Sequence, residues 1–200
     1  AQFKKFLEAN PEWRKDRIDR KYHDGAYLND WNGMDYPAGE ADYPVVYVSW
    51  YAAAAYAQWV GAKLPTEAEW EKAVRGGLAW KRYPWGDTIA HDNANYAGTG
   101  GRDRWSGTSP VKSFPANGYG LFDMAGNVWE WCADEYNWDY YSQSPKNNPT
   151  GPGDPILFVS NDFTNITTSR AVPGGSYVTY SRVMRGGSWG YSDLYYLRFA

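Results

Sequence analysis

The chain has 200 residues, a length typical of one globular domain, and 20 basic against 23 acidic side chains give it a net charge of −3. This balance provides no basic surface of the kind that neutralises phosphates, so nucleic acid is not expected as a partner. The one cysteine excludes an intramolecular disulfide framework and any zinc or iron–sulfur site built from several cysteines. No apolar run approaches the ~18 residues that span a membrane, so no transmembrane segment is expected, and the compartment stays open.

Aromatic content is the unusual feature of the composition, with 12 Trp, 18 Tyr and 7 Phe in a chain that also holds 21 Gly and 12 Pro. Average domains are richer in Leu, Ala, Ser and Val. Many rings joined by many turn residues predict a fold with much irregular backbone. Ring packing and hydrogen bonds from Tyr and Trp are expected to hold it together.

The start of the chain predicts a helix that ends before Pro11. The apolar residues that recur there at helical spacing are Phe3, Phe6 and Leu7. Residues 11–44 are polar and rich in turn formers, which predicts a long surface loop. A short strand is expected over Val45–Val48.

Two further helices have clear start signals. Ser49 is a preferred N-cap residue type ahead of an Ala-rich helix over Trp50–Val60, which the next glycine ends. Thr66 and Glu69 form the sequence signature of a capping box, and the helix that they open ends at Gly76-Gly77.

Gly, Pro, Asn and Asp recur every few residues after Tyr83, so only short strands are expected in the rest of the chain. The candidates are Tyr119–Phe122, Val128–Ala133 and Ser181–Arg185. The sequence therefore predicts an α+β architecture with two well-defined helices near the N-terminus, long loops and short antiparallel strands.

Two stretches combine oxygen-bearing side chains with tight turns. Asn95-Tyr96 is followed closely by Asp103 and Trp105, and Asp123 and Glu130 flank a glycine turn. Hard cations such as Ca²⁺ prefer carboxylate, amide and carbonyl oxygens of this kind. The alternative interpretation of the second stretch is an Asx turn followed by a solvated glutamate.

Hydrolytic chemistry has little support. Neither His23 nor His91 has a cysteine or an acid at the spacing of a catalytic triad. The acids within residues 67–71 lie at a helix N-terminus, where they serve the cap and the helix dipole, so a glycosidase is rejected.

The Arg185–Trp189 stretch has the sequence Arg-Gly-Gly-Ser-Trp. Its two glycines allow another part of the backbone to approach closely; the alternative interpretation is a strand with a glycine bulge.

Six motifs occur in a fixed order between Val45 and Trp189. They are LPTEAEWE at 64–71, RGG at 75–77, PWG at 84–86, ANGYGL at 116–121, GNVWEW at 126–131 and RGGSW at 185–189. Together they resemble the formylglycine-generating enzyme (sulfatase-modifying factor) family. The resemblance implies a variant of the C-type lectin fold with low regular secondary structure, in a single domain over residues 1–200. It also implies an N-terminal strand region and a C-terminal end beyond this sequence, and without them a partner is expected to cover a sheet edge.

The resemblance further implies one or two Ca²⁺ sites. The first ligand set is the Asn95 side chain, the Tyr96 carbonyl, the Asp103 carboxylate and the Trp105 carbonyl. The second is the Asp123 side chain, the carbonyls of Gly126 and Val128, and the Glu130 carboxylate. Bound ions would stabilise loops whose backbone groups lack strand partners.

Catalytic members of this family are copper-dependent oxidases that convert a sulfatase cysteine into formylglycine with O₂, and two thiolates hold their Cu(I). The match places Leu194 and Phe199 at the two cysteine positions, and neither side chain can bind copper. Cys132 matches neither position. We therefore expect a noncatalytic domain that takes Ca²⁺ and no copper.

A second branch of the family, the variable proteins of diversity-generating retroelements, accounts better for the end of the sequence. In those proteins an Arg-Gly-Gly-Ser-Trp segment precedes positions at which template adenines are randomised. The residues after Trp189 are reachable from such codons, and their Tyr, Ser, Gly and Asp content is typical of binding surfaces for a protein or another surface ligand. The expected contact residues are Trp189, Tyr191, Ser192, Asp193, Tyr195 and Tyr196.

Three alternatives stay open. The Tyr-rich segment is also compatible with an ordinary edge that packs against the core. Residues outside this sequence could complete a copper oxidase or a relative with iron-dependent oxidative chemistry. The aromatic content also permits a structural subunit of a surface assembly.

Overall fold

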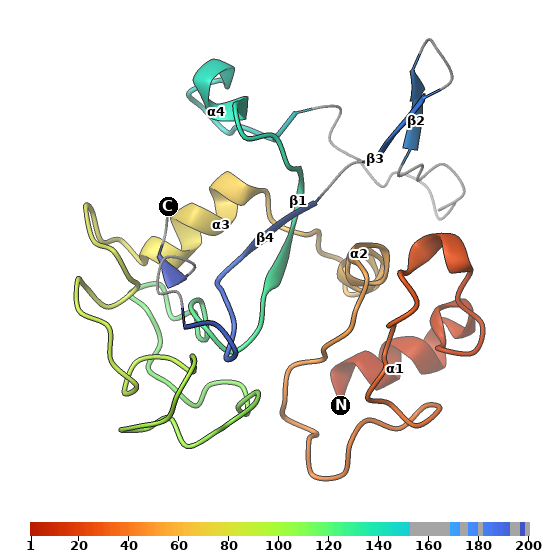
Figure 1. Cartoon of the computed structure of the whole chain (residues 1–200), viewed down its shortest axis with the longest axis horizontal. Helices are drawn as coiled ribbons and strands as arrows, with labels where there is room; N and C mark the ends of the chain where they lie inside the picture. Colours follow the sequence, from red (N-terminus) through yellow and green to blue (C-terminus); the bar gives the residue numbers. More distant parts are fainter. Residues whose placement is uncertain (153–168, 173–175, 180–181, 193–196, 199–200) are drawn as a thin grey trace.

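The computed structural model describes residues 1–152, 169–172, 176–179, 182–192 and 197–198. The helices in these residues are α1 (Gln2–Ala9), α2 (Trp50–Trp59), α3 (Glu67–Arg75) and α4 (Tyr140–Gln143), with 3₁₀ turns η1 (Pro11–Trp13) and η2 (Arg20–Tyr22). The strands are β1 (Glu130–Glu135), β2 (Ser169–Val172), β3 (Ser176–Thr179) and β4 (Arg182–Arg185). Long loops connect these short elements, as Figure 1 shows, so the predicted α+β class with little regular structure is confirmed.

The strands form two antiparallel pairs, β1 with β4 and β2 with β3. Facing residues in the first pair are Glu130 and Arg185, Trp131 and Met184, and Glu135 and Arg182, with an irregularity between Trp131 and Glu135. In the second pair the register runs from Ser169 facing Thr179 to Val172 facing Ser176. Two of the predicted strands therefore exist with shifted bounds: β1 runs over 130–135 where 128–133 was expected, and β4 begins at Arg182.

Helix α3 begins and ends as the sequence predicts. The Thr66 hydroxyl accepts a hydrogen bond from the Glu69 N–H at 3.1 Å, and the Glu69 carboxylate accepts one from the Thr66 N–H at 2.9 Å. Gly76 then ends the helix in the left-handed conformation, with φ at 55°. A Cβ at this position would lie 2.7 Å from the Gly118 nitrogen, so both the dihedral angle and the packing require glycine here.

The other two predicted helices are also present. The Ser49 hydroxyl accepts a hydrogen bond from the Ala52 N–H at 3.2 Å and so caps α2. Helix α1 buries the three apolar residues that predicted it, Phe3, Phe6 and Leu7.

Two predicted strands are wrong. Val45–Val48 is irregular, because Tyr47 has a φ of 56°, which no strand residue adopts. Tyr119–Phe122 is part of a turn organised by Asn117. The amide oxygen of Asn117 accepts hydrogen bonds from the N–H groups of Tyr119 and Leu121, at 2.9 and 3.1 Å, and this arrangement replaces any strand ladder.

The segment predicted as a surface loop, residues 11–44, contributes much of the main hydrophobic core. Its polar residues are largely exposed, but the apolar ones pack against α1 and α2. The buried residues of this segment are Trp13, Ile18, Tyr27, Leu28 and Trp31. The hydrophobic effect therefore overrides the loop-like composition at these positions.

A second, smaller core lies between α3 and the β1–β4 pair. It contains Trp70, Val74, Cys132 and Val183, with Met124 packed against it. An ion pair between Arg185 and Glu67 also joins β4 to the start of α3. In the described part of the chain, no helix is long and apolar enough to cross a bilayer.

Candidate functional site

The first predicted oxygen set is brought together around Asp103, which is 1% exposed. Its carboxylate accepts hydrogen bonds from the backbone N–H groups of Tyr96 and Trp105, both at 3.3 Å. The same carboxylate lies 3.1 Å from Nδ1 of His91, whose ring stacks on that of Tyr96. Three of the four predicted ligand residues are therefore joined by one buried carboxylate.

Asn95 completes this set and is also 1% exposed. Its side-chain nitrogen donates to the Gly107 carbonyl at 2.9 Å. Its side-chain oxygen is buried and has no hydrogen-bond partner among the described residues. A buried oxygen left in this state costs about 1–3 kcal/mol, and a bound cation would satisfy it.

The second oxygen set also contains a buried oxygen that has no hydrogen-bond partner among the described residues, on Asp123. One carboxylate oxygen accepts a hydrogen bond from the Lys112 N–H at 2.7 Å, and the other is buried without a partner in the described part of the chain. Asp123, Val128 and Glu130 line one cavity of about 430 Å³. Burial raises the pKa of the Asp123 carboxyl.

Glu130 receives a hydrogen bond from the Trp70 indole N–H at 2.6 Å. Burial, with a further contribution from the negative charge of Asp123, raises the pKa of the Glu130 carboxyl to about 7. The charge of Asp123 disfavours the ionisation of Glu130, and a hard cation bound between them would relieve this. Across the described residues, no group of three or more His, Cys, Asp or Glu side chains is placed to hold a metal, so any ion here needs backbone carbonyls as well.

Asn127 connects the two oxygen sets, and sequence reasoning did not identify this role. Its N–H donates to the Asn95 carbonyl at 2.8 Å, and its side chain makes two hydrogen bonds to the backbone of Ser109. Its φ of 60° is uncommon for a residue other than glycine. The position of Asn127 inside the predicted Gly126–Val128 ligand stretch was the available signal.

The expected ligand-contact residues begin at the same turn. The Trp189 N–H donates to the Asn127 carbonyl at 3.0 Å, and the Tyr191 carbonyl accepts from the Ala97 N–H at 3.3 Å. Trp189 is 41% and Tyr191 43% exposed, and the Tyr191 ring meets the Trp129 ring edge to face. Two large rings are therefore presented to solvent on a fixed backbone.

The remaining expected contacts are placed as follows. Ser192 is exposed. Asp193, Tyr195 and Tyr196 lie outside the described residues, as do Leu194 and Phe199, the positions matched to the copper-binding cysteines.

Copper binding does not fit the one thiol of the chain. Cys132 is 0% exposed and lies in the second core, where its carbonyl accepts a hydrogen bond from the Trp50 indole at 2.8 Å. Burial, with the nearby charges of Asp134 and Glu130, raises the pKa of the thiol well above its ordinary value. A neutral, inaccessible thiol is a poor copper ligand.

The described residues thus form short helices and a small antiparallel ladder, with loops tied by buried Asn and Asp side chains. A family model described as "Sulfatase-modifying factor enzyme 1-like domain" matches residues 1–199. The chain belongs to this family, and the resemblance seen in its motifs is confirmed.

The relatives carry different names. The chain is 43% identical over 159 residues to "Formylglycine-generating enzyme" of Streptomyces coelicolor, covering 71% of this chain and 44% of that protein. It is 48% identical over 102 residues to "Inactive C-alpha-formylglycine-generating enzyme 2" of Bos taurus, covering 48% of this chain and 34% of that protein. A solved structure, "Treponema denticola variable protein 1", matches with 29% identity and a TM-score of 0.42, covering 68% of this chain and 39% of that one. The chain spans about half the length of the first two curated relatives it matches.

Proposed function

We propose that this domain is a noncatalytic, calcium-stabilised, lectin-like binding module that displays residues 189–199 to a protein or another surface ligand. One observation carries the proposal: the backbone of Asn127 bonds to Asn95 on one side and to Trp189 on the other. The candidate cation sites and the exposed rings therefore share a single turn. Recognition by rigid aromatic side chains on such a scaffold needs little conformational ordering.

Calcium stabilisation is supported by the two buried oxygens that lack partners, on Asn95 and Asp123. With the carboxylates of Asp103 and Glu130 they supply the mixture of charged and neutral oxygens that Ca²⁺ prefers. A bound ion supplies positive charge and coordination there. The residues themselves fix the turn that carries Asn127 and, through it, Trp189.

Noncatalytic function is supported by the state of Cys132, and the name of one relative is compatible with it. The Cys132 thiol is buried in the core. A relative that is 48% identical over 102 residues has a name that calls it inactive, so identity at this level does not by itself transfer the activity.

Diversification of the displayed segment is part of the proposal, and it rests on the residues that follow Trp189. They are reachable from randomised adenine-containing codons. Sequencing the locus tests it: we expect a near-duplicate of the region coding for residues 185–200 that differs at adenines. A locus without such a copy would leave the binding role but remove the diversification.

Hydrogen exchange tests the link between calcium and the displayed segment. In the full-length protein with excess Ca²⁺, the Trp189 and Ala97 amides should be protected, because each donates to a backbone carbonyl of this region. Excess EDTA should speed exchange at both amides and lower the melting temperature. The Glu69 amide, which donates within the α3 capping box, is the internal control and should change much less. Equal exchange at Trp189 in both conditions would contradict the proposal.

The second candidate function is copper-dependent formylglycine generation, and the observation in its favour is the 43% identity to the Streptomyces coelicolor protein of that name. A competition titration with a chromophoric Cu(I) chelator separates the two candidates. The binding module should not remove Cu(I) from the chelator, whereas an oxidase completed by thiols elsewhere in the protein should hold one Cu(I) tightly.

A further inference from the structure

The two oxygen sets meet at a point where only glycine fits. The Gly126 carbonyl belongs to the second set, and a Cβ on this residue would overlap the carbonyl oxygen of Asn95, whose side chain belongs to the first set. Gly126 also has a φ of 80°, a value that favours glycine. The two ligand stretches are therefore in direct backbone contact, with no flexible side chain between them.

Asn127 adds a hydrogen bond to this contact. Its N–H donates to the same Asn95 carbonyl at 2.8 Å. The two backbone carbonyls of the second set, those of Gly126 and Val128, lie on either side of Asn127 in the chain. A left-handed asparagine persists only where its surroundings hold it, so whatever fixes these two carbonyls also fixes Asn127 and, with it, Asn95.

A second connection between the sets runs through residues 107–112. The Gly107 carbonyl accepts a hydrogen bond from the side-chain nitrogen of Asn95 at 2.9 Å, and the Lys112 N–H donates to one carboxylate oxygen of Asp123 at 2.7 Å. Asn95 and Asp123 are the residues whose remaining side-chain oxygen is buried without a partner in the described part of the chain. One short stretch therefore orients both of the oxygens that a cation would satisfy.

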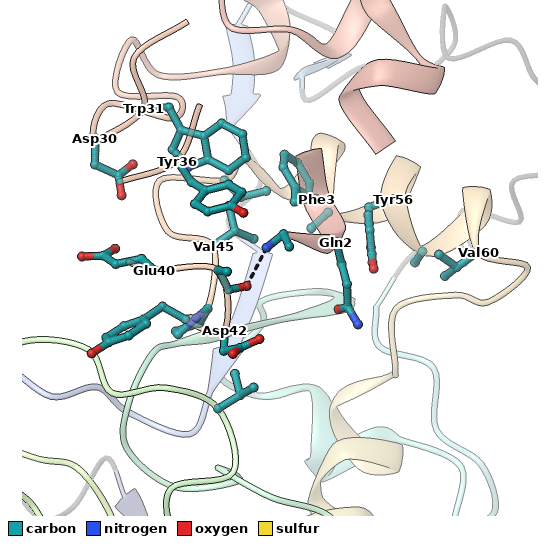
Figure 2. Close-up of a pocket in the computed structure, with 18 of the residues that line it drawn as sticks. Gln2, Phe3, Asp30, Trp31, Tyr36, Glu40, Asp42, Val45, Tyr56 and Val60 are labelled. Atoms are coloured by element: carbon teal, nitrogen blue, oxygen red, sulfur yellow. Dashed lines mark hydrogen bonds between the residues drawn. The ribbon is translucent and has the colours of Figure 1, made fainter. Parts of the chain in front are cut away.

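The middle of this stretch is held from two sides. On one side the Asn127 side chain accepts a hydrogen bond from the Ser109 N–H at 3.0 Å and donates one to the Ser109 carbonyl at 3.2 Å. On the other side the Val111 N–H donates to the Asp42 carbonyl at 2.8 Å. Figure 2 shows Asp42 beside a cavity that residues of α1 and α2 also line. Because residues 107–112 are anchored in this way, a displacement at one oxygen set is passed on to the other.

We propose that the domain binds two Ca²⁺ ions cooperatively, so that an ion at either oxygen set raises the affinity of the other set, through Asn127 and residues 107–112. This coupling rests on the calcium sites of the proposed function. Cooperative sites would fix the turn that carries Trp189 over a narrower range of Ca²⁺ concentration than independent sites would.

The sign of the coupling follows from the cost of ordering the shared contacts. The first binding event bears the cost of fixing Asn127 and residues 107–112, and the second does not bear it again. Repulsion between two divalent ions acts in the opposite direction, but the carboxylates of Asp103, Asp123 and Glu130 offset most of the ionic charge. Couplings of this kind typically change affinity by about 5- to 150-fold.

A thermodynamic cycle measures the coupling. Asp103→Asn removes the charge of the first set and leaves the second intact, and Glu130→Gln removes a charge from the second set and leaves the first intact. The full-length protein and each variant are freed of metal and titrated with Ca²⁺ in competition with a chromophoric chelator. The product of the two stepwise association constants of the unmodified protein should exceed the product of the two single-site constants by about tenfold. By linkage the coupling is the same whichever ion binds first, so the steps need no assignment.

Asn127→Gly tests the route of the coupling. Glycine keeps the backbone N–H and readily adopts a φ of 60°, but it loses both side-chain hydrogen bonds to Ser109. This variant should lower the coupling at least about threefold. Asn148→Gly is the matched control, because Asn148 has a φ of 49°, is exposed and belongs to neither oxygen set, and it should leave the coupling unchanged. The unmodified protein should also give a Hill coefficient clearly above unity, a measurement that needs no variant to fold.

The possible outcomes distinguish a failure of the coupling from a failure of the proposed function. Absence of Ca²⁺ binding would overturn both. Binding of one ion per chain, or of two ions with no coupling or negative coupling, would leave a calcium-stabilised domain and overturn the cooperativity. Equal losses of coupling in Asn127→Gly and Asn148→Gly would also overturn the proposal, because the route through Asn127 is part of it.

Discussion

Substituting Glu130 by glutamine should change stability in opposite directions with and without Ca²⁺. The Glu130 carboxyl is buried beside Asp123, and its pKa is raised from 4.5 to about 7, mainly by burial. In the metal-free protein the folded state therefore binds a proton more readily than the unfolded state does. The stability that protonated Glu130 contributes is present below about pH 4.5 and is lost as the pH rises to about 7.

The size of this loss follows from the shift. A rise from 4.5 to about 7 corresponds to about 3 kcal/mol at 1.36 kcal/mol per pKa unit. A glutamine at this position has no charge to bury and still offers an oxygen to the Trp70 indole. In EDTA at pH 8, Glu130→Gln should therefore stabilise the domain by up to about 3 kcal/mol, or raise its melting temperature by about 6–12 °C.

With excess Ca²⁺ the same substitution should be harmful. The ion would favour the ionised Glu130 as a ligand, and a glutamine removes that charge. One site at a hundredfold excess over its Kd contributes about 2.7 kcal/mol, and the variant should lose most of this increment.

Scanning calorimetry in EDTA and in Ca²⁺ measures both the stabilisation and the destabilisation expected of Glu130→Gln. Glu12→Gln, an exposed acid outside both oxygen sets, is the control and should melt like the unmodified protein in each condition. A Glu130→Gln protein that melts lower in EDTA and keeps the full calcium-dependent rise would refute the assignment of Glu130 to a cation site.

Three further predictions concern the scaffold. Thr66→Ala should lower the free energy of unfolding by about 1 kcal/mol in urea titrations, whereas Thr66→Ser should retain the hydrogen bond to Glu69 and most of the stability. Gly76→Ala should destabilise by more than about 1 kcal/mol, because alanine disfavours a φ of 55° and its Cβ would meet the Gly118 nitrogen at 2.7 Å. Cys132 should react with a disulfide reagent only after unfolding, so rapid labelling of the native protein would contradict its burial.

Local signals predicted the helices well. The Thr66 and Glu69 pair and the Ser49 cap specify helix starts through hydrogen bonds made within three residues, so tertiary structure is not needed to find them. The strands were harder, because a stretch such as Val45–Val48 has strand-like composition, yet its backbone is set by long-range contacts. The Leu28 N–H donates to the Tyr47 carbonyl, for example, across a loop that no local pattern describes.

The candidate sites, like the secondary structure, could be predicted only where the residues involved are close in sequence. Asn95 and Asp103 are close in sequence and could be proposed as a pair, and the structure joins their segment through the bond from the Tyr96 N–H to Asp103. The sequence did not predict the cavity that Phe3, Trp31 and Trp131 line, because only the folded chain brings these residues together.

The most direct test of the central claim is turnover of a sulfatase-derived Cys-x-Pro-x-Arg peptide by the full-length protein with copper and O₂. The account predicts that mass spectrometry finds the cysteine unchanged, while the domain still melts at a higher temperature in Ca²⁺ than in EDTA. Conversion of the peptide cysteine to formylglycine over many turnovers would contradict a domain that only binds.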